Sequence, residues 1–140
     1  MQAPAALGLR EKIGPRMRRI LIIDDEDDIR EVAALSLEAT AGWQILTARS
    51  GAEGIAIATA QHPDAILMDV MMPGVDGPTT FRAMQGNPAV SNIPVLFLTA
   101  KVQGVDQRRF AGLGVAAILF KPFDPLTLAQ QISEVLGWKD

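Results

Sequence analysis

Four short polar segments of this 140-residue chain each follow a run of apolar residues, and their side chains are types that can do chemistry. The first is a run of five consecutive acids, Asp24 to Asp28, directly after Ile20–Ile23. The others, in chain order, are Asp69 after Ile66–Met68, Thr99-Ala100 after Val95–Leu98, and Lys121-Pro122 after Ala117–Phe120. Carboxylates, a hydroxyl and an ammonium are groups that can bind a hard cation and receive a phosphoryl group.

This chemistry requires the carboxylates of Asp24, Asp25 and Asp69 to lie in one crevice. They would repel one another and raise each other's pKa unless a cation joined them, and Mg²⁺ suits such oxygen ligands while keeping waters for a phosphate. Asp69 can then attack phosphorus as a carboxylate nucleophile and form an aspartyl phosphate. Lys121 and the Thr99 hydroxyl can neutralise the phosphoryl oxygens.

The polar segments need a scaffold that brings them together, and the apolar pattern predicts one. Five apolar runs of about four residues lack strict alternation, as expected for strands buried on both faces. These runs are Ile20–Ile23, Ile45–Ala48, Ala65–Met68, Val95–Leu98 and Ala117–Phe120. The stretches between and after them predict five helices, at about 27–41, 52–61, 78–85, 105–113 and 125–136.

Strict alternation of strands and helices predicts an α/β fold, a doubly wound, five-stranded parallel sheet of the flavodoxin type. The strand order expected is 2-1-3-4-5, with its ligand crevice at the carboxyl ends of strands 1 and 3. The polar segments follow the strands at that edge. We expect one domain over residues 17–140 and a mobile tail over residues 1–16, which is a native extension or lies before the true start at Met17.

Composition and charge exclude several classes of protein. The net charge is −3, but the first 19 residues have five bases and one acid, whereas residues 20–140 have eight bases and 15 acids. This acidic body argues against binding to nucleic acid. No apolar run approaches the roughly 18 residues of a membrane helix, so we expect no membrane contact and a cytoplasmic location. The absence of cysteine excludes disulfides and thiolate chemistry.

Four segments together resemble the response-regulator receiver domain, the CheY-like family, in its stand-alone single-domain form. They lie in the family's order and the resemblance covers about residues 17 to 138: Ile20 to Glu26, Ile66 to Gly77, Pro94 to Ala100 and Leu119 to Phe123. The resemblance implies a phosphoacceptor in a two-component phosphorelay. It also implies that Asp69 is the phosphoacceptor and that Asp24 and Asp25 are the acidic pair, with Asp25 the more direct ligand of Mg²⁺ (or Mn²⁺). Met71 matches the position that offers its backbone carbonyl to the metal.

The resemblance assigns the other site residues too. Thr99 matches the switch hydroxyl, Ala100 the small residue that leaves room for the phosphoryl group, and Lys121 the lysine that pairs with it. A cis peptide bond before Pro122 is common in the family. One position departs from the family pattern, because Ile118 stands where a Tyr or Phe usually moves with the threonine. Output is therefore expected to use other shifts near strand 4, the fourth predicted helix (about 105–113) and strand 5.

The resemblance implies a signalling protein, with self-catalysed phosphotransfer and autodephosphorylation only, rather than a conventional enzyme. Its partners would be a histidine kinase or a histidine phosphotransfer protein, and a downstream protein target, with no attached effector domain. A receiver fragment of a hybrid histidine kinase is an alternative. An aspartate-nucleophile phosphatase would need an acid at Met71, and a nucleotide- or flavin-binding domain would need a Gly- or Ser/Thr-rich loop where Asp24–Asp28 stand.

The remaining polar residues have structural interpretations. Asp27 and Asp28 favour the start of a helix, where free N–H groups and the helix dipole stabilise acids, and Glu26 lies between the two halves of the acidic run. His62 precedes Pro63 at a predicted helix end, far from the crevice, and is expected to be a surface residue.

Overall fold

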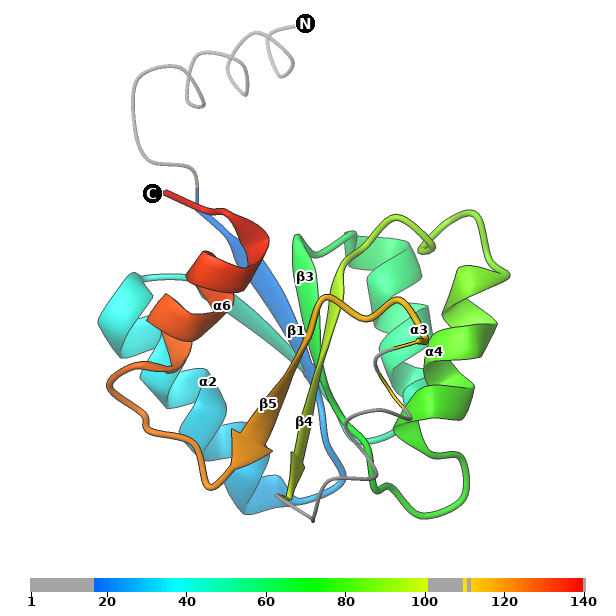
Figure 1. The fold of residues 1–140 in the computed structure, drawn as a ribbon, viewed down its shortest axis with the longest axis horizontal. Helices are drawn as coiled ribbons and strands as arrows, with labels where there is room; N and C mark the ends of the chain where they lie inside the picture. Colours follow the sequence, from blue (N-terminus) through cyan, green and yellow to red (C-terminus); the bar gives the residue numbers. More distant parts are fainter. Residues whose placement is uncertain (1–16, 101–109, 111, 140) are drawn as a thin grey trace, which may run out of the picture.

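A computed structural model describes residues 17–100, 110 and 112–139, and these residues form one parallel sheet flanked by helices (Figure 1). The sheet has the order β2-β1-β3-β4-β5, with every neighbouring pair parallel. Its strands are β1 (Arg19–Ile23), β2 (Gln44–Ala48), β3 (Ala65–Asp69), β4 (Val95–Ala100) and β5 (Ala117–Lys121). The predicted fold class and strand order are confirmed.

The described residues contain four helices rather than the five predicted. They are α2 (Asp27–Ala41), α3 (Gly51–Gln61), α4 (Gly77–Gln85) and α6 (Leu128–Leu136). The helix expected at about 105–113 falls largely on residues 101–109 and 111, which lie outside the described part of the chain, as does the expected tail at 1–16.

The start of the last helix was predicted wrongly, by three residues. It begins at Leu128 rather than near Pro125 because the preceding residues form a turn on Asp124. The Asp124 carboxylate accepts a hydrogen bond from Leu126 N at 2.9 Å, and its carbonyl accepts one from Thr127 N at 3.1 Å. The same carbonyl also accepts a hydrogen bond from Leu128 N at 3.0 Å, so the turn leads directly into the helix and Asp124 bonds the free N–H groups as a capping residue does.

Helices cover both faces of the sheet, so each strand is buried on both sides. In Figure 1, α2 and α6 lie on one face and α3 and α4 on the other. Alternate β1 side chains enter the two cores: Leu21 and Ile23 pack on the α3 and α4 side, and Ile20 and Ile22 on the α2 and α6 side. All four are at most 1% exposed, which explains why the strand reads as a continuous apolar run.

The helix starts that border the sheet edge are set by local polar contacts. Ser50 caps α3 by accepting a hydrogen bond from Glu53 N at 3.2 Å, and Asp76 caps α4 through Thr79 N at 2.9 Å. At α2 the N-cap is Glu26, without a side-chain cap, and Asp27 and Asp28 form an acidic first turn. Their placement confirms the split of the acidic run into a strand end and a helix start.

None of the helices in the described part of the chain has the length and apolarity needed to cross a bilayer. His62 is exposed, with a left-handed φ of 48°, at the C-terminus of α3. The residue therefore lies at the end of α3 that is remote from the carboxyl edge of the sheet, as expected.

Candidate functional site

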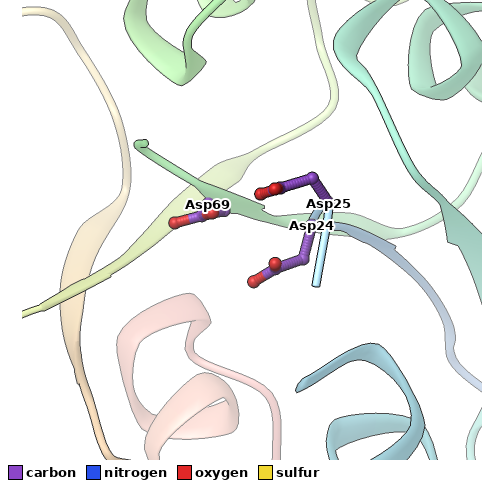
Figure 2. A group of neighbouring side chains, drawn as sticks. All are labelled: Asp24, Asp25 and Asp69. Carbon is purple, nitrogen blue, oxygen red and sulfur yellow. The ribbon is translucent and has the colours of Figure 1, made fainter. Parts of the chain in front are cut away.

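Three carboxylates converge at the carboxyl edge of β1 and β3. Oxygens of Asp24, Asp25 and Asp69 all lie within 4.8 Å of one another (Figure 2). The register explains the meeting, because Ile23 of β1 pairs with Met68 of β3 and an acid follows each. Asp24 and Asp69 are 1% and 4% exposed, whereas Asp25 lies nearer the solvent.

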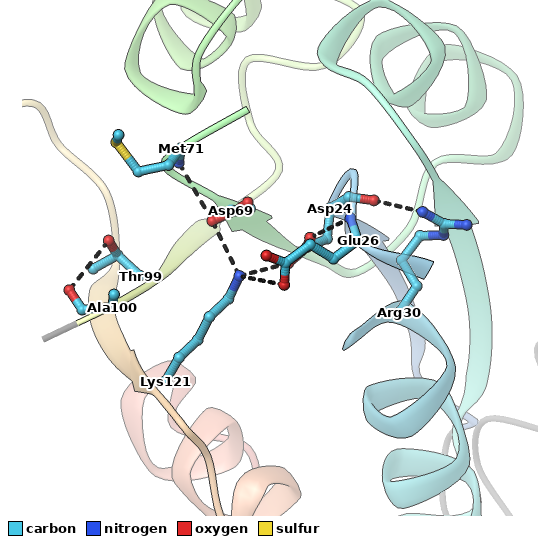
Figure 3. A network of polar contacts seen from close by, with 8 residues as sticks. All are labelled: Asp24, Glu26, Arg30, Asp69, Met71, Thr99, Ala100 and Lys121. Atoms are coloured by element: carbon cyan, nitrogen blue, oxygen red, sulfur yellow. Dashed lines mark hydrogen bonds and ion pairs between the residues drawn. The ribbon is translucent and has the colours of Figure 1, made fainter. Parts of the chain in front are cut away.

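The Lys121 ammonium lies between these acids. Its Nζ is 3.1 Å from Asp24 Oδ2, 3.3 Å from Asp69 Oδ1 and 3.8 Å from Glu26 Oε2 (Figure 3). The lysine ends β5, and the Lys121-Pro122 peptide bond is cis, as expected. One ammonium thus pairs with two buried carboxylates, so the buried part of the site retains an excess of negative charge.

The surroundings of Asp69 perturb its ionisation. Burial, and then the charge of Asp24, raise the pKa of Asp69 to about 6, although Lys121 and the Met71 N–H oppose the rise. Burial works against the charged form of Lys121, but the acids around it raise its pKa above the ordinary value, with Asp24 and Asp69 foremost. At neutral pH Asp69 is therefore mostly an anion, and Lys121 is a cation.

The donor set fits a hard divalent cation. Asp24 Oδ2 is buried and receives no well-aligned hydrogen bond from the described residues, although the Lys121 ammonium lies 3.1 Å away. Oxygen ligands from two or three carboxylates suit Mg²⁺ or Mn²⁺, and no sulfur or nitrogen ligand competes in the group. An added cation would relieve the repulsion that raises the pKa of Asp69.

The other predicted site residues border this group. Met71 N donates to Asp69 Oδ1 at 3.3 Å, and the Met71 side chain is 74% exposed, so the main chain of Met71 contacts the site. Thr99 is buried at the end of β4, one residue beyond Leu98, which pairs with Asp69. Its hydroxyl donates a long hydrogen bond of 3.5 Å to the carbonyl of Ala100, as Figure 3 shows.

Two further residues join the network that the sequence analysis did not assign to it. Glu26 reaches Lys121, and Arg30 Nη1 donates to the Asp24 carbonyl at 2.8 Å (Figure 3). The spacing of Asp27 and Arg30, three residues apart on a predicted helix, could have indicated an ion pair. The bond from Arg30 to a backbone carbonyl has no sequence signal, because every residue type presents that acceptor.

The sequence of the chain is similar to those of known proteins. The sequence matches the family model of the response regulator receiver domain over residues 20–133. It is 38% identical over 121 residues to Protein PilH of Pseudomonas aeruginosa, covering 86% of this chain and 99% of PilH. It is 37% identical over 121 residues to the phosphate regulon transcriptional regulatory protein PhoB of the same organism, covering 85% of this chain but only 52% of PhoB.

The fold is similar to a solved structure as well. The chemotaxis response regulator CheY4 of Vibrio cholerae superposes with a TM-score of 0.78 at 30% sequence identity. The match covers 86% of this chain and 99% of CheY4.

Proposed function

The chain belongs to the response regulator receiver domain family, and we propose that it accepts a phosphoryl group on Asp69 from a phosphohistidine. The donor would be a histidine kinase or a histidine phosphotransfer protein, and a further protein would respond to the phosphorylated form. Two-component signalling is the setting of the family, and the proposal applies equally to a free-standing receiver and to a receiver domain of a hybrid histidine kinase.

The chemistry follows from the side chains at the edge of the sheet. A carboxylate oxygen of Asp69 attacks phosphorus and forms a P–O bond, while the P–N bond of the phosphohistidine breaks. The bonding electron pair stays on the imidazole nitrogen, and the product is an acyl phosphate on Asp69. Bound Mg²⁺, held by Asp24, Asp25, Asp69 and the Met71 carbonyl, would neutralise phosphoryl oxygens as a Lewis acid.

Lys121 supplies the second positive charge. In the structure its ammonium pairs with Asp24 and Asp69, and the incoming phosphoryl oxygens would replace Asp69 as its partner. Thr99, once its hydroxyl turns from the Ala100 carbonyl, would donate to another of these oxygens. The small side chain of Ala100 would leave room for the group.

The shared position of Lys121 between Asp24 and Asp69 is the observation that supports this proposal most. A salt bridge that only stabilised the fold would need one acid. Burying two carboxylates costs more solvation free energy than their attraction to one ammonium recovers. The arrangement keeps Asp69 ionised above its pKa of about 6 yet poorly solvated, which suits a nucleophile.

We propose that the output uses shifts near β4, β5 and the helix predicted at about 105–113, most of which lies outside the described residues. The family's usual aromatic residue is replaced by Ile118, which packs against the core on the α3 and α4 side. Unchanged amide chemical shifts on β4, on β5 and over residues 105–113 after phosphorylation would contradict this part of the proposal.

We propose no further catalytic activity. Receivers are signalling proteins, and here self-catalysed phosphotransfer and autodephosphorylation would suffice, in the cytoplasm and without nucleic acid or membrane. The aspartate-nucleophile phosphatase alternative needs an acid two residues after the nucleophile, whereas Met71 stands there with an exposed thioether. Turnover of simple phosphate monoesters by the chain would favour that alternative.

The metal dependence of phosphorylation tests the proposal. We expect a small phosphodonor such as acetyl phosphate to add one phosphoryl group in the presence of Mg²⁺ and to add none after chelation. Equal addition with and without Mg²⁺ would contradict the metal-assisted mechanism.

A further inference from the structure

Arg30 contacts the acidic loop from the first turns of α2. Its Nη1 donates to the backbone carbonyl of Asp24 at 2.8 Å, and its Nη2 pairs with Asp27 Oδ1 (Figure 3 shows the first of these bonds). The Arg30 side chain is only 14% exposed. The guanidinium therefore bridges the end of β1 and the start of α2, across the loop that presents the acidic pair.

The carbonyl that Arg30 contacts belongs to the peptide unit that joins Asp24 to Asp25. Because a peptide unit is planar, fixing its carbonyl also fixes the direction in which the Asp25 backbone leaves it. The rest of Asp24 is held as well: its N–H donates to the Ala48 carbonyl at 3.1 Å, and its Oδ1 accepts a hydrogen bond from Glu26 N at 2.9 Å. The Arg30 bond thus constrains the one peptide plane shared by both acids.

We propose that Arg30 is a positioning residue for the metal site, which it serves by fixing the Asp24–Asp25 peptide plane. The proposal rests on the metal site of the proposed function. The planar guanidinium, with donors in a fixed fork, can bond the carbonyl and the Asp27 carboxylate at once, which a lysine ammonium on a flexible stem does less well.

Two effects of Arg30 on a bound cation have opposite signs, so they can be separated. As a positive charge near the site, Arg30 should weaken Mg²⁺ binding, and its removal should tighten binding. As a positioning residue, Arg30 should strengthen binding, because groups that orient metal ligands typically change metal affinity by about 10- to 100-fold.

The chain offers a matched control in Arg49. Its Nη2 lies 3.6 Å from the same Asp27 oxygen, but this side chain is 70% exposed and its contact is with Asp27 rather than with the Asp24 carbonyl. Arg30→Gln and Arg49→Gln remove the same charge from the same neighbourhood. Arg30→Lys keeps the charge and removes the fork, so it tests position alone, and it stays informative if the Gln variant does not fold.

The experiment measures the dissociation constant of Mn²⁺ from its electron paramagnetic resonance signal, with Mg²⁺ as competitor, in the full chain and the three variants. We expect Arg30→Gln to weaken binding by about tenfold, at the lower end of effects seen for groups that orient metal ligands. Arg30→Lys should weaken binding to a smaller extent, and Arg49→Gln should leave binding unchanged or slightly tighter.

Three outcomes would overturn the inference. The first is binding of Mn²⁺ by Arg30→Gln that is as tight as in the parent chain, or tighter. If that variant does not fold, Arg30→Lys takes its place in this comparison. The second is equal weakening in Arg49→Gln, which would reveal a general effect of charge near Asp27. The third is a parent chain that binds no divalent cation, which would also remove the metal site, whereas the first two leave the proposed function intact.

Discussion

At the scale of single residues, Asp69 is buried, and its surroundings disfavour the negative charge of its carboxylate. Burial and the neighbouring Asp24 raise its pKa to about 6, from an ordinary value of 3.8. Between pH 3.8 and about 6, the folded protein therefore keeps a proton on Asp69 that the unfolded chain has already lost. The contribution of this group to the free energy of unfolding falls as the pH rises through that range. The nucleophile is thus kept ionised at neutral pH at a cost to stability.

Asp69→Asn should remove this cost. Without Mg²⁺ the variant should be more stable than the parent at pH of about 7.5, by roughly 1–3 kcal/mol, and the difference should shrink by about 1–2 kcal/mol at pH of about 4.5. Urea unfolding at the two pH values measures this. The exposed Asp28→Asn is the control, and a gain for Asp69→Asn that does not depend on pH would contradict the assignment.

Lys121 has the opposite role at the same site, because its ammonium offsets the charges of Asp24 and Asp69. Lys121→Met should cost about 2–4 kcal/mol of stability without Mg²⁺, since it leaves two buried acids without their counter-charge. The same change should tighten Mg²⁺ binding, because no ammonium then competes for Asp24 Oδ2. Urea unfolding and metal titration measure the two effects.

The exposed Lys139→Met provides the comparison for Lys121, since it removes an equal charge outside the site. Weaker Mg²⁺ binding in Lys121→Met would show that the ammonium supports the metal site rather than competing with it. The sign expected here is opposite to the sign expected for Arg30, although both residues are cations.

At the scale of elements, the junction of β3 and α4 determines where Asp69 lies. A Cβ at Gly77 would lie 2.5 Å from the Asp69 carbonyl oxygen and 3.0 Å from Val70 Cα, both backbone atoms that cannot turn aside. Gly77 N also donates to the Val70 carbonyl at 2.9 Å. The start of α4 therefore packs directly on the strand end that presents the nucleophile.

Gly77→Ala should destabilise the fold by about 1–3 kcal/mol, because the added methyl group forces the backbone apart. It should also slow phosphorylation of Asp69, since the strand end has to shift. Gly86→Ala is a matched control, as the nearest atom to a Cβ there is 3.7 Å away, at the other end of the same helix. Equal stability and phosphorylation rates in the two variants would contradict the close approach.

The elements also show what the sequence could predict. The apolar runs predicted all five strands. A parallel arrangement of these strands was enough to predict that Asp24 lies beside Asp69, because each acid follows the end of its strand. The start of α6 was missed by three residues because the chain enters the helix through a turn over residues 125–127 that bonds to Asp124. Arg30 was missed because its acceptor is a backbone carbonyl, which leaves no trace in a sequence.

At the scale of the whole molecule, the net charge of −3 conceals where the charges lie. The five-acid run is divided by the fold, with Asp24 and Asp25 at the end of β1 and Asp27 and Asp28 in the first turn of α2. Asp24 and Asp25 lie with Asp69, whereas Asp27 pairs with Arg30 and Asp28 is exposed in the first turn of the helix.

Metal binding should therefore stabilise the whole fold. At a Mg²⁺ concentration tenfold above the dissociation constant, the gain should be about 1.4 kcal/mol, because the ion binds only the folded chain. Thermal unfolding with and without Mg²⁺ measures this. The stabilisation should be lost in Asp25→Asn and kept in Asp28→Asn; loss in both variants would indicate a diffuse acidic patch instead of a site.

Asp69 alone should accept the phosphoryl group. The most direct test is the intact mass of the parent, Asp69→Asn and Asp28→Asn after incubation with Mg²⁺ and a small phosphodonor. We predict one phosphoryl adduct on the parent and on Asp28→Asn, and none on Asp69→Asn. An adduct on all three proteins, or on none of them, would contradict the claim.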